Sequence, residues 1–410
     1  MKTSRRRFLQ LGVAAGLSFG FAPRLLLRPA RAQAARRRAL VVIFQRGAVD
    51  GLNMVVPFTE ARYHDLRPNI AVPEPGAGEG AALDLDGRFG LHPAMAVLQP
   101  AFAAGELAVV HACGSPDGSR SHFDAQDYME SGYPGIKSYA DGWLNRHLQS
   151  SPSGSGAIFR ALALGNELPL ALYGPAEALA ISGLNQLRIG RGRAEELVQA
   201  AVAQMYVERE DLLGSAVRGS LEAVDLAGGI DDGPPANGAT YPAGALGAQL
   251  QDVARVIRSG LGLEVAFLSV GGWDTHSNQG GTAGQLPNLL ATLARAMAAF
   301  RTDLGSLFED VCVLTTSEFG RTLGENGSLG TDHGHGTAML VHGGTVKGGR
   351  VYGSWPGLGE DDLFEGRDLA VTTDFRTLFA EVIERHLGNP NIAAVFPGFD
   401  YGESTRLGLY

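Results

Sequence analysis

The amino-acid sequence predicts an α/β fold in which a mostly parallel sheet is flanked by helices on both faces. Its strand candidates are continuous apolar runs, which are typical of strands buried on both sides. Helical and strand-like segments also alternate through the C-terminal half without an internal repeat, as expected when helices connect parallel strands. The chain has 410 residues, 45% hydrophobic and 19% charged, a composition that supports a large globular core.

In the N-terminal half, two strands and two helices are predicted. The apolar run at 39–44 is the first strand. Residues 90–115 indicate a helix, a turn at Gly105 and a second buried strand. Residues 121–131 indicate a further helix.

The middle of the chain is predicted to be an insertion into this fold. Residues 157–230 combine short apolar pieces, broken by Gly and Pro, with amphipathic helical stretches. A linker rich in Gly and Pro is expected at about 226–246. Beyond the linker, helices and strands alternate regularly. The predicted order is helix 248–259, strand 264–270, helix 286–304, strands 310–317 and 337–344, and helix 375–388.

Residues 1–32 have the pattern of a twin-arginine signal peptide. Three consecutive arginines precede an apolar run that ends near Ala22, too short to span a bilayer comfortably, which takes ~20 apolar residues. An A-x-A sequence ending at Ala32 offers a cleavage site. The alternatives are an uncleaved membrane anchor and a basic tail. We expect export by the twin-arginine translocation machinery to the periplasm or outside the cell, no stable membrane insertion, and a single mature domain at 33–410.

Charge and cysteine content narrow the possible functions. Removal of the leader leaves 27 basic residues against 43 acidic ones, a formal charge of −16. Such a surface repels nucleic acid and anionic membranes, so nucleic acid is not an expected partner. Cys113 and Cys312 both lie in apolar, strand-like runs. Buried free thiols are therefore expected, although an oxidising compartment would permit a disulfide.

Polar residues gather where the predicted strands end. In open α/β sheets, functional groups collect at the carboxyl ends of the strands. Carboxylate oxygen together with imidazole nitrogen suits Zn, Mn or Fe better than Mg or Ca. We therefore expect one or two divalent metal ions at this edge. The expected ligands are Asp50, Asp274, His276, Glu318, Asp332, His333 and His335.

Each expected ligand also has a purely structural interpretation. Asp50 alone is more often a turn residue or a helix cap. The spacing of Asp274 and His276 also occurs in plain turns, and Glu318 could form an ion pair with Arg321. Their shared position at strand ends favours the metal site for the set as a whole. Among the other histidines, we expect His64, His147 and His386 on the surface, His92 in a turn, and His111 and His342 at strand ends as weaker candidates.

Ser121 is a candidate nucleophile at the start of the predicted helix 121–131. A hydroxyl there feels the positive end of the helix dipole, which favours its ionisation beside a metal. The structural alternative is a capping box with Asp124. Arginines and a histidine nearby could hold an anionic ester substrate. The catalytic candidates are Ser121, Arg120, His122 and Arg321, with Arg46 as a further anion-binding candidate.

Five segments together resemble one family, DUF1501. They are QRGAVDGLNMVVPF, SRSHFDAQDYMESG, GGWDTHSNQ, TTSEFGRT and DHGHGTAMLVHGG, and the likeness covers nearly the whole mature chain. The DUF1501 family is similar to the alkaline phosphatase and sulfatase superfamily. That likeness implies an alkaline-phosphatase-like fold with metal at the strand ends and a Ser, Thr or modified Cys nucleophile at a helix N-terminus.

Carried over by position, the resemblance gives several residues a role. Asp50 resembles the first-strand metal ligand, and Ser121 occupies the place of the nucleophile. Asp274 and His276 resemble a D-x-x-x-H pair, although the spacing here is D-x-H. Either Glu318 or Asp332, together with His333, resembles a DH pair, although the strand expected to end in DH here ends in Glu318 and the DH sequence follows later. His335 resembles the final histidine. The departures in spacing leave the number of ions open.

The sequence therefore predicts an exported, metal-dependent hydrolase of phosphate or sulfate esters. A non-catalytic secreted protein that uses its metal to stabilise loops for binding a partner or a polysaccharide is the main alternative. A metal-dependent isomerase or transferase is a third possibility. The family itself implies no substrate.

Overall fold

The computed structural model describes residues 38–137, 139–151, 157–187, 201–202, 204–206, 209 and 211–410. The expected signal peptide at 1–32 lies outside these residues. Within them, no helix is both long enough and apolar enough to cross a membrane.

The chain divides into two compact units. The larger unit consists of Arg36–Gln186 and Ile230–Tyr410. The other includes Leu187–Gly229, within which the structure describes the helix α8, Leu212–Ala227. The side chain of Asp211 caps α8 by accepting a hydrogen bond from the backbone N–H of Gly214.

A nine-stranded sheet forms the centre of the larger unit, in the order β11-β5-β10-β9-β1-β8-β6-β7 with β12 also pairing with β5. Only β10 runs antiparallel to its neighbours, β5 and β9, and the other pairs are parallel. The predicted mostly parallel sheet is confirmed. The strands are β1 Ala39–Gln45, β5 Leu107–Gly114, β6 Ala161–Leu164, β7 Leu179–Ile181, β8 Val265–Val270, β9 Val311–Thr316, β10 Thr337–Gly343, β11 Val351–Tyr352 and β12 Thr373–Asp374.

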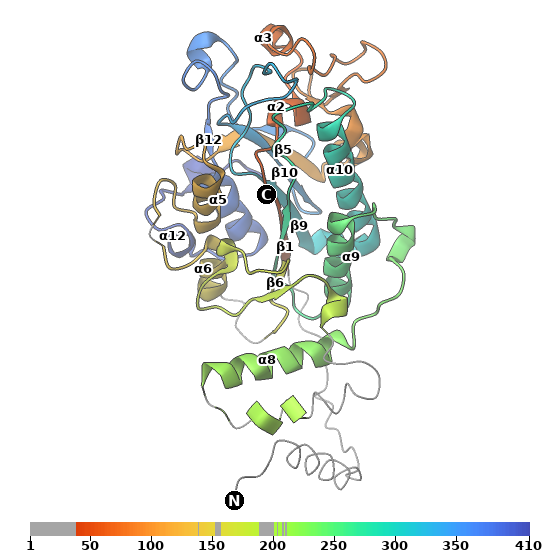
Figure 1. The fold of residues 1–410 in the computed structure, drawn as a ribbon, viewed down its shortest axis with the longest axis vertical. Coiled ribbons are helices and arrows are strands. Elements are labelled where there is room, and N and C mark those ends of the chain that lie inside the picture. The colour runs from red at the N-terminus through yellow and green to blue at the C-terminus, as the bar shows by residue number, and fades with distance from the viewer. Residues whose placement is uncertain are drawn as a thin grey trace, which may run out of the picture. The chain divides into compact units, whose positions relative to one another are not determined.

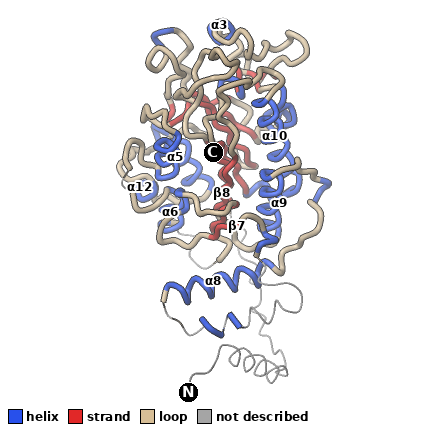
Figure 2. Tube along the Cα trace, viewed as in Figure 1, coloured by secondary structure: helices blue, strands red, loops and turns tan. Residues whose placement is uncertain are grey.

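Helices cover both faces of this sheet (Figures 1 and 2), as the sequence predicts. On one side lie α5 His122–Ser131, α6 Trp143–Ser150 and α12 Ile392–Val395, and on the other α9 Ala245–Arg258 and α10 Gln285–Leu304. Successive side chains of β1 point to opposite faces of the sheet, so each face needs its own layer of helices. On one face, Leu40, Val42 and Phe44 belong to a core cluster with residues of α6 and of α11, Phe375–Glu381. The intervening residues of β1 are equally buried, which is why the strand reads as a continuous apolar run.

Shorter elements complete the larger unit. A small antiparallel sheet pairs β4 with β2 and β3. Other elements include α2 Gly51–Met54, β2 Val55–Val56, α3 Ala61–Asp65, β3 Leu83–Asp84, β4 Gly90–Leu91, the 3-10 helix Pro93–Leu98, α4 Gln99–Ala103 and the π-helical turn Val382–His386 that extends α11.

Two expectations about the fold need correction. The start of the expected insertion, residues 157–186, instead supplies β6 and β7 to the central sheet. These strands are only four and three residues long, so their apolar runs are too short to stand out in the sequence. The expected surface positions of His147 and His386 are also wrong, because both side chains are fully buried. His147 bonds to Glu264 at 2.9 Å and His386 to the backbone oxygen of Ala39 at 3.0 Å.

The two cysteines are buried and free, as predicted. Burial raises the pKa of Cys312 to about 12 and raises that of Cys113 further. Burial thus favours the neutral form of both thiols, which disfavours a nucleophilic role for either.

Candidate metal centre

One edge of the central sheet collects most of the candidate residues. β1, β5, β8 and β9 run in the same direction, because β10 is antiparallel to both β5 and β9 while β1 is parallel to β8 and β9. Their carboxyl ends therefore lie at the edge where β10 begins. His122 follows β5 as the first residue of α5, Asp274 and His276 follow β8, and His333 precedes β10.

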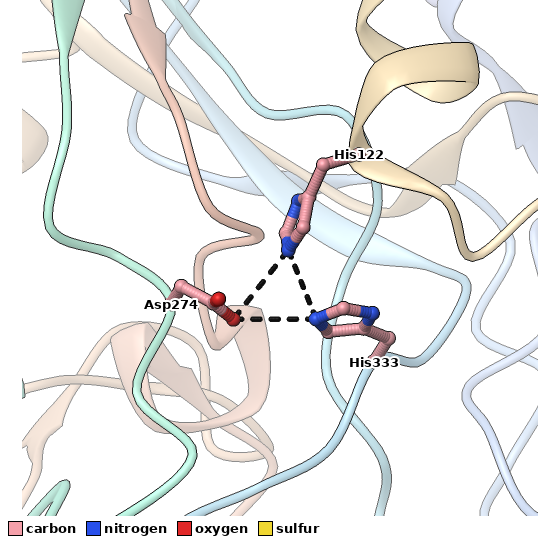
Figure 3. A group of neighbouring side chains, drawn as sticks. All are labelled: His122, Asp274 and His333. Atoms are coloured by element: carbon pink, nitrogen blue, oxygen red, sulfur yellow. Dashed lines mark hydrogen bonds and ion pairs between the residues drawn. The ribbon is translucent and has the colours of Figure 1, made fainter.

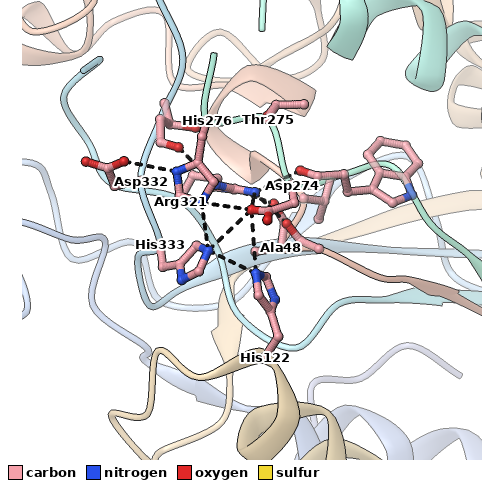
Figure 4. Close-up of polar contacts among 12 residues, drawn as sticks. Ala48, His122, Asp274, Thr275, His276, Arg321, Asp332 and His333 are labelled. Atoms are coloured by element: carbon pink, nitrogen blue, oxygen red, sulfur yellow. Dashed lines mark hydrogen bonds and ion pairs between the residues drawn. The ribbon is translucent and has the colours of Figure 1, made fainter. Parts of the chain in front are cut away.

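Four side-chain atoms converge at this edge (Figures 3 and 4). The Nε2 atom of His333 lies 2.9 Å from Nε2 of His122, 2.9 Å from Nε2 of His276 and 3.2 Å from Oδ1 of Asp274. The same Asp274 oxygen lies 3.0 Å from Nε2 of His276 and 3.5 Å from Nε2 of His122. Among the described residues, His122, Asp274 and His333 (Figure 3) form a group of three side chains whose ligand atoms all lie within 4.8 Å of one another.

The opposite nitrogen of each of these imidazoles meets an oxygen acceptor. Nδ1 of His122 lies 2.7 Å from Oε1 of Glu318. Nδ1 of His276 lies 3.0 Å from Oδ1 of Asp332, and Nδ1 of His333 lies 2.9 Å from the backbone oxygen of Arg120. Each Nδ1 must carry a proton to donate to its oxygen, so a ring that is neutral presents a lone pair at Nε2.

Three imidazole Nε2 atoms and one carboxylate oxygen thus face one another. Between neutral rings and the carboxylate a proton or a cation is needed, and ligands about 2.0–2.1 Å from one tetrahedral Zn ion lie roughly 3.3 Å apart. Five of the six separations among these atoms, at 2.9–3.5 Å, are close to that spacing. Oxygen acceptors on the far nitrogens are also the usual partners of metal-binding histidines. The residues present therefore fit a divalent metal ion.

The site is open to solvent. The side chains of Asp274 and His276 are 45% and 42% exposed, and those of His122 and His333 are about half as exposed. Structural zinc sites are closed by their protein ligands, while catalytic sites remain accessible to substrate. The exposure therefore favours a site that small molecules reach.

The model of a family described as "protein of unknown function (DUF1501)" matches residues 37–395. The chain belongs to the DUF1501 family. No curated protein matches it significantly. Among solved structures, the PH0037 protein from Pyrococcus horikoshii is similar with 13% sequence identity and a TM-score of 0.30, over 75% of this chain and 86% of that chain. At this TM-score the likeness does not establish a shared fold.

Arg321 of this DUF1501 protein supports the site but does not face solvent. The sequence suggests that it holds substrate, yet the side chain is fully buried. Its guanidinium donates to Oδ1 of Asp274 at 2.5 Å and to four backbone oxygens, those of Gly47, Ala48, Trp273 and Thr331. Burial alone would raise the pKa of Asp274, but Arg321 together with His276 and His122 holds that pKa below its usual value. Arg321 therefore fixes the loops that carry Asp274.

Glu318 and Asp332 lie behind the histidines instead of among the inward-facing atoms. Glu318 is fully buried, and its Oε1 accepts from Gln126, from the backbone N–H of Gly47 and from His122. Burial would raise the pKa of Glu318, but the hydrogen bonds from His122 and Gln126 hold it below its usual value. Asp332 is exposed and also accepts from Asn326, which lowers its pKa together with His276. Both carboxylates orient ligands of this DUF1501 protein.

Asp50 belongs to a separate, buried network. Its two carboxylate oxygens accept from the guanidinium of Arg67 at 2.7 and 3.1 Å. Gln279 donates to Oδ2 at 2.6 Å, and the backbone N–H of Asn53 donates to Oδ1. Asp50 is thus the helix cap of α2 and one half of a buried ion pair. These contacts correspond to the structural interpretation of Asp50.

His335 also points to other partners. Its ring stacks on Phe364 with 4.1 Å between the ring centroids. Burial lowers the pKa of His335, so the ring is neutral at pH 7. Sequence proximity to His333 does not bring His335 into the cluster, because the chain bends at His335 and its ring packs on Phe364 instead.

The anion-binding candidates are engaged with acids. Arg120 pairs with Asp368 at 2.6 Å and with Glu365 at 2.7 Å. Arg46 donates to Gln126 and Glu130 at 2.8 and 2.6 Å. Ser121 caps α5 through a long contact, 3.5 Å, from the N–H of Asp124 and is exposed. Its hydroxyl is therefore only weakly committed to the cap.

Close backbone packing explains the glycines of the motifs. Gly47 has a φ of 114°, and a Cβ there would lie 2.5 Å from the backbone nitrogen of Asp274. A Cβ on Gly320 would lie 1.9 Å from the backbone oxygen of Gly336. Larger residues at either position would push apart the loops that carry the ligands.

Sequence reasoning assigned His122 to substrate binding, although the structure groups it with the inward-facing ligand atoms. A signal for this exists in helix α5, where His122, Gln126 and Glu130 recur every four residues and so share one face. The neighbouring Phe123 is 86% exposed. This polar face turned inward is the reverse of an ordinary amphipathic helix.

Proposed function

We propose that this DUF1501 protein is a metal-dependent hydrolase of phosphate or sulfate esters that binds one divalent ion, Zn, Mn or Fe, through His122, Asp274, His276 and His333. One observation carries the proposal, namely the three imidazoles that present Nε2 to Asp274 while each Nδ1 is held by an oxygen acceptor. Imidazole and carboxylate together suit these metals. The open edge of the sheet supports access of a substrate.

The roles of the chain's own groups follow from their positions. A divalent ion supplies a Lewis acid for an ester oxygen. Glu318, Asp332 and the Arg120 carbonyl keep the three rings oriented. Arg321 fixes Asp274 in place. Ser121, next to His122 at the start of α5, is the proposed nucleophile, since the helix N-terminus favours its alkoxide form.

We also propose that the chain acts outside the cytoplasm. The twin-arginine pattern and the A-x-A sequence within residues 1–32 support export. A fusion of residues 1–32 to a reporter that requires the twin-arginine route would test this. Export that persists after both Arg5 and Arg6 are changed to Lys would contradict it.

Metal analysis combined with an ester screen tests the hydrolase proposal. We expect about one equivalent of Zn, Mn or Fe in the wild type, and loss of metal together with activity on aryl phosphates or sulfates in His333→Ala. The matched control is His64→Ala, which removes a partly exposed imidazole that bonds only to the backbone oxygen of Phe58. Ser121→Asn retains a good cap but lacks the hydroxyl, so it should keep the metal and lose turnover. A folded wild type without metal, or a fully active His333→Ala, would refute the proposal.

A non-catalytic, secreted metal-binding protein is the second candidate. It is favoured by the state of the arginines, since Arg46, Arg120 and Arg321 are all bonded to acids or to backbone and amide oxygens. No guanidinium among these three is free to receive an ester anion. Metal binding without turnover of any phosphate or sulfate ester would support this candidate over the hydrolase.

A further inference from the structure

A cavity of about 540 Å³ opens beside α5, within the larger unit. α5, β8 and residues 163–170, which span the end of β6 and the loop after it, form its walls. Its volume lies in the range of small-molecule binding sites, roughly 300–1,000 Å³. None of the proposed metal ligands lines it.

Helix α5 joins this cavity to the proposed metal ligands. His122 and Gln126 lie one turn apart on the same face, which places them about 6 Å apart along the helix axis. Gln126 lines the cavity and donates to Oε1 of Glu318 at 2.8 Å, the same oxygen that meets Nδ1 of His122. A molecule with its reacting group at the metal ligands would therefore reach the cavity with a neighbouring group only a few bonds away.

The charges of the lining disfavour an anionic or purely apolar occupant. Among the described residues of the lining, Arg46 is the only cation, and it is paired with Glu130 at 2.6 Å. The carboxylates of Asp127 and Glu167 are exposed and have no second cation in the lining to balance them. An anionic group would meet their repulsion, and an apolar group would remove them from water without compensation.

The hydrogen-bonding groups of the lining match hydroxyls. Carboxylate oxygens of Asp127 and Glu167 accept hydrogen bonds, and the amide nitrogen of Asn166 donates them. Ser269 accepts from Arg46 at 3.1 Å, which leaves its own proton to donate. A hydroxyl both donates and accepts, whereas an ammonium group only donates and could not use Asn166 or Ser269 as donors.

We propose that this cavity binds a neutral polyhydroxylated group, the sugar-like part of the ester whose phosphate or sulfate reacts beside His122. The assignment rests on the proposed hydrolase function for the reacting end. The assignment of a polyhydroxylated group to the cavity rests only on the residues that line it. The two can therefore fail separately.

The first measurement compares esters with and without hydroxyls in the metal-loaded, full mature protein. The probes are glucose 6-phosphate and glucose 6-sulfate against phenyl phosphate and phenyl sulfate. Glu167→Trp places a ring in the cavity at an exposed position, and Glu403→Trp makes the same change at an exposed glutamate outside the lining. We expect Glu167→Trp to lower kcat/KM for the glucose esters about tenfold or more relative to the phenyl esters, with metal content unchanged. Glu403→Trp and the conservative Glu167→Gln should keep the wild-type preference.

The second measurement does not depend on turnover. Calorimetric titration with D-glucose, D-galactose and myo-inositol should show binding to the wild type and to His333→Ala, and none to Glu167→Trp. Sugar binding without any ester hydrolysis would refute the hydrolase and keep the cavity assignment. Ester hydrolysis without sugar binding, equal loss for both ester classes in Glu167→Trp, or a preference for phosphoethanolamine over glucose 6-phosphate would overturn the assignment.

Discussion

Two carboxylates that follow strands of the same sheet have opposite environments in this molecule. Asp50, after β1, is fully buried and gives both oxygens to Arg67. Asp274, after β8, is 45% exposed, and one of its oxygens faces three imidazole nitrogens and Arg321. In sequence the two look alike, each an acid close to glycine after an apolar run. The partners that arrive from elsewhere in the chain decide which one is structural.

The largest effect on the free energy of unfolding is expected at the buried ion pair of Asp50 and Arg67. Arg67→Met leaves the Asp50 carboxylate buried without its guanidinium, and breaking such a pair typically costs about 3–5 kcal/mol of unfolding free energy. Urea denaturation would measure the loss, and metal content per folded molecule should stay at the wild-type level. Asp50→Asn combined with Arg67→Met should recover part of the stability. Loss of metal in folded Arg67→Met protein would show that the two regions are not independent.

A second buried ionic cluster, formed by Glu264 with His147 and Arg160, should make the free energy of unfolding depend on pH. Glu264 bonds to His147 and Arg160 at 2.9 and 2.7 Å. Burial alone would raise the pKa of Glu264, but these partners outweigh it and hold that pKa at about 2. The folded value lies below the unfolded value, so the stabilisation is present above about pH 4.5 and is lost as pH falls towards 2. A shift of that size corresponds to roughly 3 kcal/mol.

The measurement is the unfolding free energy between pH 7 and pH 3 for the wild type and for Glu264→Gln. The wild-type curve should fall more steeply than that of the variant, which no longer titrates at this position. Parallel curves would mean that other carboxylates dominate the acid response.

The smallest expected effect is on metal affinity and differs between Glu318 and Asp332, the two carboxylates behind the histidines. Glu318→Gln weakens the support of His122 at a fully buried position, and loss of such support typically lowers metal affinity about 10–100-fold. Asp332→Asn should lower it less, because the Asp332 side chain is 57% exposed and water replaces it easily. Chelator competition would rank the two variants. A larger effect for Asp332→Asn would mean that His276 contributes more to binding than His122 does.

The main elements of the fold were predictable because their periodicity is strong. The strands at 39–44 and 310–317 and the helices at 248–259 and 286–304 appear in the structure within a few residues of the expected bounds. β6 and β7 were missed because a strand of three or four residues carries too little pattern. β6 depends on β8, about 100 residues later in the chain, for its pairing.

The site was predictable as a region but not as a set of roles. The strand-end rule located Asp274, His276, Glu318, Asp332 and His333 at one edge. It could not tell a side chain that reaches the centre from one that stops behind a ring, since that depends on distances of about 3 Å between loops far apart in sequence. Asp50 shows the same limit, because Arg67 lies 17 residues further along the chain.

The contacts of Arg321 bear on when the protein could acquire a metal. This one side chain bonds to the loop after β1, the loop after β8 and the segment before β10. The ligand geometry therefore exists only after all three segments have folded, so the proposed ion would be captured by a finished scaffold and would not nucleate it. If the leader carries the folded chain across the membrane, as proposed, the choice among Zn, Mn and Fe is made where folding takes place. The cytoplasmic supply of free metal, and not that of the destination, would then determine which ion the exported molecule contains.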